Sequence, residues 1–96
     1  MERNEVSMHE LKVYAALKKR HSKWATHADI YQDVADVSPR TIRAHVLKFV
    51  RLGLVDQAEV FPAHRYRLSD KAEKRNKGYV TRLETAAEVF GIEVSP

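Results

Sequence analysis

The stretch of residues 38–55 constrains the fold of this 96-residue chain more than any other. Ser38 is a good N-cap, Pro39 suits the first helical position, and Gly53 suits the left-handed residue that ends a helix. These signals predict a helix over residues 39–52 that runs directly into a strand.

The two faces of this predicted helix differ sharply in chemistry. Ile42, Val46 and Phe49 recur at helical spacing and form an apolar stripe. The rest of the helix carries four basic side chains and no acidic one: Arg40, Arg43, Lys48 and Arg51. An ordinary solvated helix carries both signs of charge, whereas an exclusively basic outer face is what a helix facing phosphate groups needs.

The composition excludes several classes of protein. Because the chain has no cysteine, it has no disulfide framework, no thiolate nucleophile and no cysteine-based zinc site. No apolar run approaches the roughly 20 residues that span a bilayer, and the N-terminal residues lack the pattern of a secretory signal. The length suits one domain. We therefore expect a cytoplasmic, nucleoid-associated protein with no membrane partner.

Two further helices are predicted before Ser38. Residues 7–10 fit a capping box that starts the first helix. Residues 26–29 offer another cap, for a second helix over residues 27–34. Trp24, in the connector between them, is expected to pack inward as an anchor. Only three residues separate the second helix from Ser38, which predicts a helix-turn-helix arrangement.

A hairpin is predicted after the third helix. Residues 54–61 and 65–68 have the pattern of two strands joined by a turn at residues 62–64. The expected partners are Val60 with Tyr66, Ala58 with Leu68, and Glu59 with Arg67. Apolar pairs then line one face and a charged pair the other, as a half-buried hairpin requires. The order of elements predicts an α+β, mostly α chain with a winged helix-turn-helix fold: three helices, a hairpin wing and a C-terminal helix.

Two segments resemble a known class of regulators. The sequence RTIRAHVLKFVRLGLV (residues 40–55) resembles the recognition helix and strand entry of winged helix-turn-helix transcriptional regulators of the MarR, ArsR and PadR kind. The sequence YRLSDKA (residues 66–72) resembles the segment after their wing, with Ala72 where glycine is frequent, a departure that favours helix continuation. The resemblance covers roughly residues 8–72. It implies a DNA-binding transcription factor, usually dimeric, with the third helix in the major groove and the hairpin against the backbone or minor groove.

Candidate DNA contacts lie on the third helix and the wing. Arg40 and Arg43 could form the bidentate bond that arginine makes with guanine O6 and N7; contact with phosphates or solvent alone is the alternative. At the wing, Arg65 is the stronger candidate for phosphate or minor-groove contact, whereas Arg67 could simply pair with Glu59. The expected DNA-binding residues are Ser38, Arg40, Thr41, Arg43, Ala44, Lys48, His64, Arg65 and Arg67.

The C-terminal segment carries a heptad seam. Ser69 suits an N-cap, and a helix is predicted from there to Gly91, with Gly78 as a point where it could break. The seam residues are Ala72, Asn76, Tyr79, Leu83, Ala86 and Phe90. This seam can pack on the first helix of its own chain, or pair with a second copy, which the resemblance favours. The expected organisation is a winged-helix domain (1–69), a dimerisation helix packed on it (70–91) and a tail (92–96).

The remaining polar residues indicate neither a metal site nor an enzyme. No two of the five histidines have the spacing that places two ligands on one helical turn. The sequence also lacks a nucleophile–base constellation, a glycine-rich phosphate loop and a carboxylate pair in apolar sequence. The basic residues Lys71, Lys74, Arg75 and Lys77 are interpreted as a solvated helix face. We expect no metal, no cofactor and no catalysis.

These observations together predict a homodimeric transcriptional regulator, with its small size favouring a repressor. Its two-fold symmetry predicts an inverted repeat in double-stranded DNA, with half-sites about 10 base pairs apart or a multiple of that. One alternative is a winged helix used as a protein-interaction module, whose third helix usually loses its basic face. Another is a replication, partition or architectural DNA-binding factor, which only the natural binding site would separate from a regulator.

Overall fold

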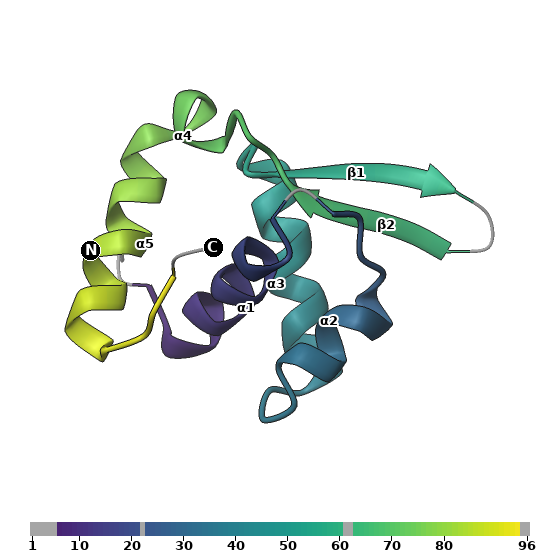
Figure 1. Ribbon diagram of the computed structural model, residues 1–96, viewed down its shortest axis with the longest axis horizontal. Helices are drawn as coiled ribbons and strands as arrows, with labels where there is room; N and C mark the ends of the chain where they lie inside the picture. Colours follow the sequence, from purple (N-terminus) through teal and green to yellow (C-terminus); the bar gives the residue numbers. More distant parts are fainter. Residues whose placement is uncertain (1–5, 22, 61–62, 95–96) are drawn as a thin grey trace.

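The computed structural model describes residues 6–21, 23–60 and 63–94. The elements in chain order are α1 (Met8–Lys19), α2 (His27–Asp33), α3 (Pro39–Arg51), β1 (Val55–Val60), β2 (Ala63–Leu68), α4 (Ala72–Arg75) and α5 (Lys77–Phe90). The hairpin of β1 and β2 projects away from the helices, and α5 lies on the opposite side of the molecule (Figure 1). The predicted order of three helices, a hairpin and a helical C-terminal segment is confirmed.

The caps of α2 and α3 are those that the sequence predicts. The Thr26 hydroxyl accepts a hydrogen bond from the Asp29 backbone N–H (3.2 Å), and the Asp29 carboxylate accepts one from the Thr26 N–H (3.0 Å). The Ser38 hydroxyl accepts from the Thr41 N–H (3.2 Å). Gly53 follows α3 with a φ of 84°, a conformation that favours glycine. Local sequence signals therefore set where the helix-turn-helix pair begins and ends.

The capping box predicted at the start of α1 is only half formed. The Ser7 hydroxyl accepts a hydrogen bond from the Glu10 N–H (3.1 Å), but the Glu10 carboxylate does not return to the backbone of Ser7. It is buried, and its Oε2 lies 3.2 Å from Nζ of Lys48. A buried carboxylate without a counter-charge is destabilising. The Glu10 carboxylate therefore pairs with Lys48 of α3 and does not cap α1.

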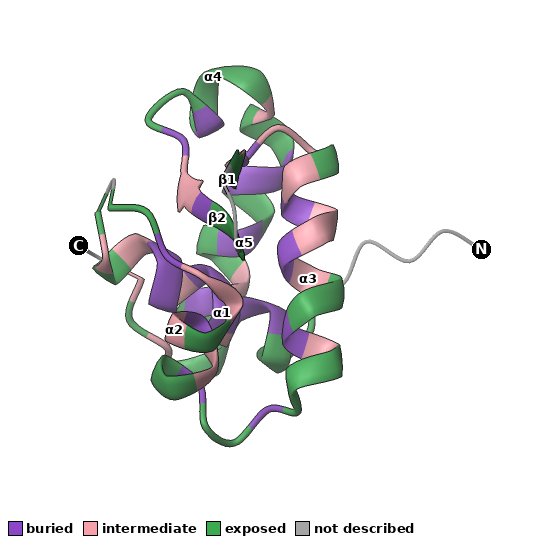
Figure 2. Cartoon of the chain, turned by 90° about the vertical axis from the view of Figure 1, so that its right-hand side faces the viewer, coloured by how far each residue is buried: buried purple, intermediate pink, exposed green. Residues whose placement is uncertain are grey.

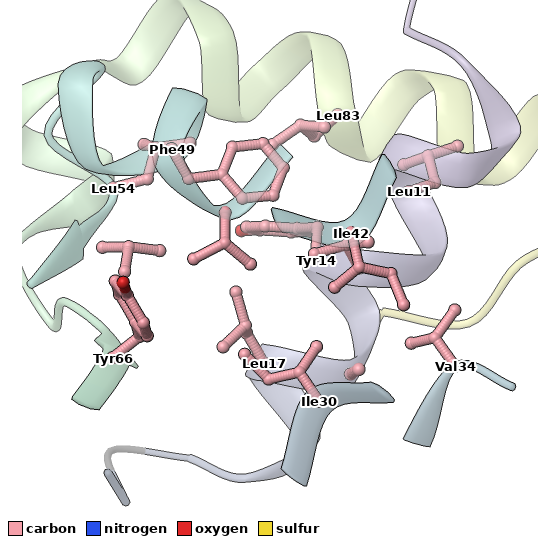
Figure 3. Close-up of a cluster of buried hydrophobic side chains, with 14 of the residues drawn as sticks. Leu11, Tyr14, Leu17, Ile30, Val34, Ile42, Phe49, Leu54, Tyr66 and Leu83 are labelled. Atoms are coloured by element: carbon pink, nitrogen blue, oxygen red, sulfur yellow. The ribbon is translucent and has the colours of Figure 1, made fainter. Parts of the chain in front are cut away.

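One cluster of buried apolar side chains joins α1, α2, α3, the base of the hairpin and α5. Three fully buried side chains form the stripe predicted for α3: Ile42, Val46 and Phe49. The Phe49 ring meets Tyr14 edge-on, with centroids 6.1 Å apart (Figure 3). It meets Tyr79 in the same way, with centroids 6.5 Å apart. Since Tyr14 belongs to α1 and Tyr79 to α5, Phe49 holds α3 to both neighbouring helices.

The predicted register of the hairpin is wrong by three residues. The observed antiparallel partners are Val55 with Leu68, Asp56 with Arg67, Gln57 with Tyr66, Ala58 with Arg65, Glu59 with His64, and Val60 with Ala63. Residues 63–64, expected in the turn, belong to β2, and residues 61–62 lie outside the described part of the chain. Val55 and Tyr66 at the hairpin base are buried, whereas the projecting part is largely exposed. Because register follows the buried face, the apolar residues farther out misled the prediction.

Trp24 does not pack inward, contrary to prediction. Its neighbour Ala25 forms a bridge with Tyr66 of β2 and is buried, so Trp24 points to the opposite face and is 37% exposed. The guanidinium carbon of Arg67 lies 4.3 Å from the centroid of the Trp24 ring. Arg67 Nε also lies 3.5 Å from Oδ2 of Asp56, its cross-strand partner, which replaces the glutamate expected there.

The C-terminal helix breaks at Asn76 and not at Gly78. The Asn76 side chain accepts a hydrogen bond from the Tyr79 N–H (3.3 Å) and donates one to the Leu52 carbonyl (3.3 Å). Its amide therefore caps α5 and ties that helix to the end of α3. Ser69, expected as the N-cap, accepts a hydrogen bond from a backbone N–H two residues on (3.0 Å), before α4 begins. No described helix is both long and apolar enough to cross a lipid bilayer.

Candidate nucleic-acid interface

The outer face of α3 presents free positive charge. Arg40, Arg43 and Arg51 are exposed, and in the described part of the chain none of the three forms an ion pair. Ala44, on the same face, is exposed between them. In Figure 2 the buried residues of α3 face the other helices, and its exposed residues face away from them. The outer face is therefore available to a ligand and carries no negative charge.

The two hydroxyl residues at the start of α3 bond to each other. The Ser38 hydroxyl donates to the Thr41 hydroxyl (3.0 Å) while it accepts from the Thr41 N–H. Ser38 is exposed and Thr41 is half-buried. Both side chains therefore lie at the N-terminal end of α3, next to Arg40. The main role of Ser38 in the structure is that of the N-cap.

Lys48 differs from the other basic residues of α3. Its Nζ lies 3.2 Å from the buried Glu10 carboxylate and 5.3 Å from the centroid of the Tyr79 ring. Its charge is therefore turned toward α1 and α5. Sequence periodicity places Lys48 at the edge of the basic face but cannot show that a buried carboxylate from a distant helix lies beside it.

The wing carries two arginines in different settings, Arg65 and Arg67. Arg65 is exposed, with no ion pair in the residues that the structure describes. Arg67 stacks on Trp24 and lies beside Asp56, whose other carboxylate oxygen accepts a hydrogen bond from Arg75 of α4 (3.1 Å). Arg65 therefore has the freedom that a DNA contact needs, and Arg67 helps to fix the base of the wing.

A groove of about 400 Å³ lies between α2, α3 and β2; we call it the wing groove. Its lining residues are Thr26, His27, Ala28, Arg43, Ala63, His64 and Tyr66. None of these is acidic. His27 Nε2 lies 3.0 Å from the Tyr66 hydroxyl, and the ring stacks on Tyr31 of the same helix with centroids 6.0 Å apart. The wing groove joins the basic face of α3 to the wing.

Sequence reasoning missed His27. Its only local signal is its place next to the Thr26 cap, which shows that a helix begins there. The partner that gives the imidazole its setting, Tyr66, is 39 residues away. A corrected hairpin register alone would have placed Tyr66 on the inner strand face, but not opposite His27.

The environment of His27 disfavours its charged form. Burial lowers the pKa of the imidazole, and the positive charges of Arg43 and His64 lower it further. His45 on α3 has a lowered pKa as well, mainly through burial, with Glu10 acting in the opposite direction. Both imidazoles are therefore held neutral to lower pH than a free histidine.

These lowered pKa values predict a loss of stability in acid. In the unfolded chain both histidines bind protons near pH 6.5. In the folded chain they bind protons only at lower pH. The free energy of unfolding should therefore fall as pH drops through about 6.5, and should level off below the folded pKa values. Urea unfolding at pH 8, 6.5 and 5 measures this effect. The variant carrying His27→Gln and His45→Gln should show a flatter profile, and exposed His21→Gln serves as the control. An equally steep profile in the double variant would contradict the assignment.

The residues of the predicted seam divide between the interior and the surface. Ala72, Tyr79 and Leu83 are buried in the core of their own chain, and Asn76 is half-buried as the cap of α5. The two later members of the seam, Ala86 and Phe90, line an apolar groove of about 650 Å³ on the outer side of α5. The groove is lined by Val6, Ser7, Thr81, Arg82, Thr85, Ala86, Val89 and Phe90.

Val89 is a surface residue that the heptad pattern missed. It lies next to the seam and is 78% exposed, and Phe90 is 41% exposed. Large apolar side chains gathered beside a groove are typical of an interaction surface.

No three metal-ligating side chains come together among residues 6–21, 23–60 and 63–94.

Comparison with known proteins gives structural likenesses only. No protein-family model matches the chain, and no curated protein sequence matches it. BpsR of Bordetella bronchiseptica, whose DNA binding is regulated by 6-hydroxynicotinic acid, aligns over 100% of this chain and 73% of its own, with a TM-score of 0.65 and 12% identity. A mutant of ZitR from Lactococcus lactis aligns over 90% of this chain and 58% of its own (TM-score 0.57, 16% identity).

A third likeness is the adhesin competence repressor AdcR of Streptococcus pyogenes, with a TM-score of 0.56 and 9% identity. It aligns over 93% of this chain and 66% of its own. The chain thus spans less than two thirds of the ZitR and AdcR chains. At these identities the likeness concerns the fold. Together with the helix-turn-helix pair and the hairpin, it shows that this chain has the winged-helix fold.

Proposed function

We propose that this protein is a transcriptional regulator that binds specific sequences of double-stranded DNA. In this proposal α3 enters the major groove, and the hairpin lies against the backbone or minor groove as a wing. One observation carries it: Arg43 of α3 and His64 of β2 line the same groove, so the basic face of the helix and the wing form one surface. The fold shared with BpsR, a protein with regulated DNA binding, and with AdcR, a repressor, supports the same function.

The residues of this surface receive different roles. Arg40 and Arg43 would reach base edges or the phosphates beside them, and Arg65 would contact the backbone or minor groove. Ser38, Thr41, Ala44 and His64 would lie at the contact as smaller polar and apolar groups. Lys48 and Arg67 would act chiefly by holding α3 and the wing in place, since their charges already have protein partners.

We further propose that the protein acts as a homodimer through the outer side of α5. The apolar groove beside Val89 and Phe90 offers an apolar surface that a second copy of the chain would cover, and closed two-fold dimers are the commonest small assemblies. A dimer would present two copies of α3 to an inverted repeat. Repression, without enzymatic activity, is the mode that fits a small regulator in the cytoplasm at the nucleoid.

Phe90→Glu tests the dimer. A carboxylate in the apolar groove would be buried without a partner on association, so the dissociation constant of the dimer should rise at least tenfold. Sedimentation equilibrium of wild type and variant measures it. Lys77→Glu places a carboxylate on α5 outside the groove, with a larger change in net charge, and should still leave association unchanged. A wild type that stays monomeric at every concentration would contradict the proposal.

The direct test of the function is selection of bound sites from a pool of random duplexes. The wild type should enrich a palindrome, and its affinity should fall steeply as salt rises because bound phosphates release counterions. Weak binding that enriches no sequence would indicate an architectural factor. No binding even at low salt would contradict a DNA-binding function and favour a protein-interaction module.

A further inference from the structure

We propose that the wing groove holds one phosphodiester group of the DNA backbone, and that filling it protonates His27. The proposal rests on the DNA-binding function proposed above and adds a ligand for a site that this function leaves open. It assigns Arg43 to a phosphate rather than a base. It also makes DNA affinity rise as pH falls.

The charges around the groove fit a monoanionic phosphodiester. Arg43 is a permanent cation that has no ion pair in the described chain, and His64 is a second, titratable group on the opposite wall. Asp29 of α2 follows the lining residue Ala28, and its carboxylate is already bound to the Thr26 N–H. A volume of about 400 Å³ accommodates a phosphate group with the sugar atoms beside it.

His27 is the group whose charge responds to such a ligand. The groups that face it are Arg43 from α3, His64 and Tyr66 from β2, and Tyr31 from its own helix. In the free protein burial disfavours the charged form of the ring, and its interactions with Arg43 and His64 act in the same direction. A phosphate between Arg43 and His64 cancels their repulsion, because an added negative charge favours the imidazolium form.

Tyr66 connects the imidazole to the groove. With a proton on Nδ1, neutral His27 accepts the Tyr66 hydroxyl proton at Nε2 across the observed 3.0 Å. When Nε2 takes up a proton from solvent, it becomes the donor, and the Tyr66 oxygen becomes the acceptor. The Tyr66 O–H is then free to donate to a phosphate oxygen. No bond other than these hydrogen bonds forms or breaks, and the proton that His27 gains comes from solvent.

Histidine NMR tests the proposal directly in the full chain. The imidazole resonances of His27 are titrated in the free protein, with a saturating 20-base-pair duplex, and with inorganic phosphate alone. We expect the duplex to raise the His27 pKa by about one unit and inorganic phosphate to raise it much less. A pKa that the duplex leaves unchanged overturns the proposal. An equal rise with inorganic phosphate and none with duplex assigns the groove to a small anion and overturns it too.

Affinity measurements separate this inference from the function on which it rests. Since one pKa unit corresponds to a tenfold change in binding, wild-type affinity should rise up to tenfold as the pH falls from 8 to below the His27 pKa of the free protein. Tyr66→Phe removes no titrating charge and keeps the buried ring, yet it should flatten this profile, as His27→Gln should. His21→Gln, outside the groove lining, should keep the wild-type profile. Tight binding with the same profile in Tyr66→Phe overturns the inference alone, whereas absence of duplex binding in the wild type overturns the function as well.

Discussion

Replacing Arg40 and Arg43 together by alanine should weaken duplex binding at least about thirtyfold while leaving the fold intact. An arginine that meets a base edge contributes about 1–3 kcal/mol to recognition, and with a contribution of similar size from a phosphate contact the pair accounts for a loss of about 2–6 kcal/mol. Both side chains are exposed and form no ion pair within the described residues. Exposed substitutions of this kind change the free energy of unfolding by about 0.5 kcal/mol or less.

The measurement is the dissociation constant of the selected duplex at several salt concentrations, beside urea unfolding of the same proteins. The slope of log affinity against log salt should fall by about one for each phosphate that the variant no longer neutralises. Lys74→Ala with Lys77→Ala removes the same charge from an exposed face on α4 and α5 and should change affinity severalfold at most. If both double variants bind equally weakly, general attraction to positive charge, and not the face of α3, accounts for binding.

Much of the helix-turn-helix region could be predicted from the sequence because its determinants are local. Ser38, Pro39 and Gly53 act on backbone groups within a few residues of themselves, and the structure confirms all three. The buried stripe of α3 follows from a spacing that any amphipathic helix obeys. The basic outer face follows from the same spacing, which is why the sequence places Arg40 and Arg43 correctly on the exposed side.

The misplaced features depend on partners that are distant in sequence. The hairpin register follows the buried base at Val55 and Tyr66, which the local pattern of apolar residues does not identify. Trp24 lies outside because Ala25 next to it takes the inward position against β2. The break at Asn76 depends on the Leu52 carbonyl, which lies 24 residues earlier. Helix propensity alone favours Gly78 for that break. The break falls at Asn76 because its side chain bonds to both the end of α3 and the start of α5.

The charge partners of the basic residues of α3 also depend on residues that are distant in sequence. On a helical wheel Lys48 lies close to the arginines, yet its ammonium lies beside the buried Glu10 carboxylate of α1. A buried carboxylate without its cation is expensive, so Lys48 links the position of α3 to that of α1. The face that would meet DNA and the contacts that hold it are therefore carried by different residues of one helix.

Phe49→Ala should lower the free energy of unfolding by about 3–5 kcal/mol, the largest loss that we expect from one substitution. The ring is fully buried, and its removal leaves a cavity among side chains from three helices. Edge-on contacts with Tyr14 and Tyr79 add to the loss beyond the buried area. A domain of this size has a total stability of about 5–15 kcal/mol, so the variant should be close to unfolding at 37 °C.

Urea unfolding followed by the fluorescence of Trp24, the only tryptophan, measures this loss. The reporter lies at the surface beside Arg67, whereas the Phe49 ring is fully buried. Phe49→Leu, which keeps most of the volume, should cost less than half as much, and half-buried Val50→Ala on the same helix about 1 kcal/mol. Equal losses at Phe49 and Val50 would contradict the central place of this ring. Because Phe49 fixes α3 against both α1 and α5, DNA affinity measured on the folded fraction should fall with it, although residue 49 lies on the face opposite the proposed DNA contact.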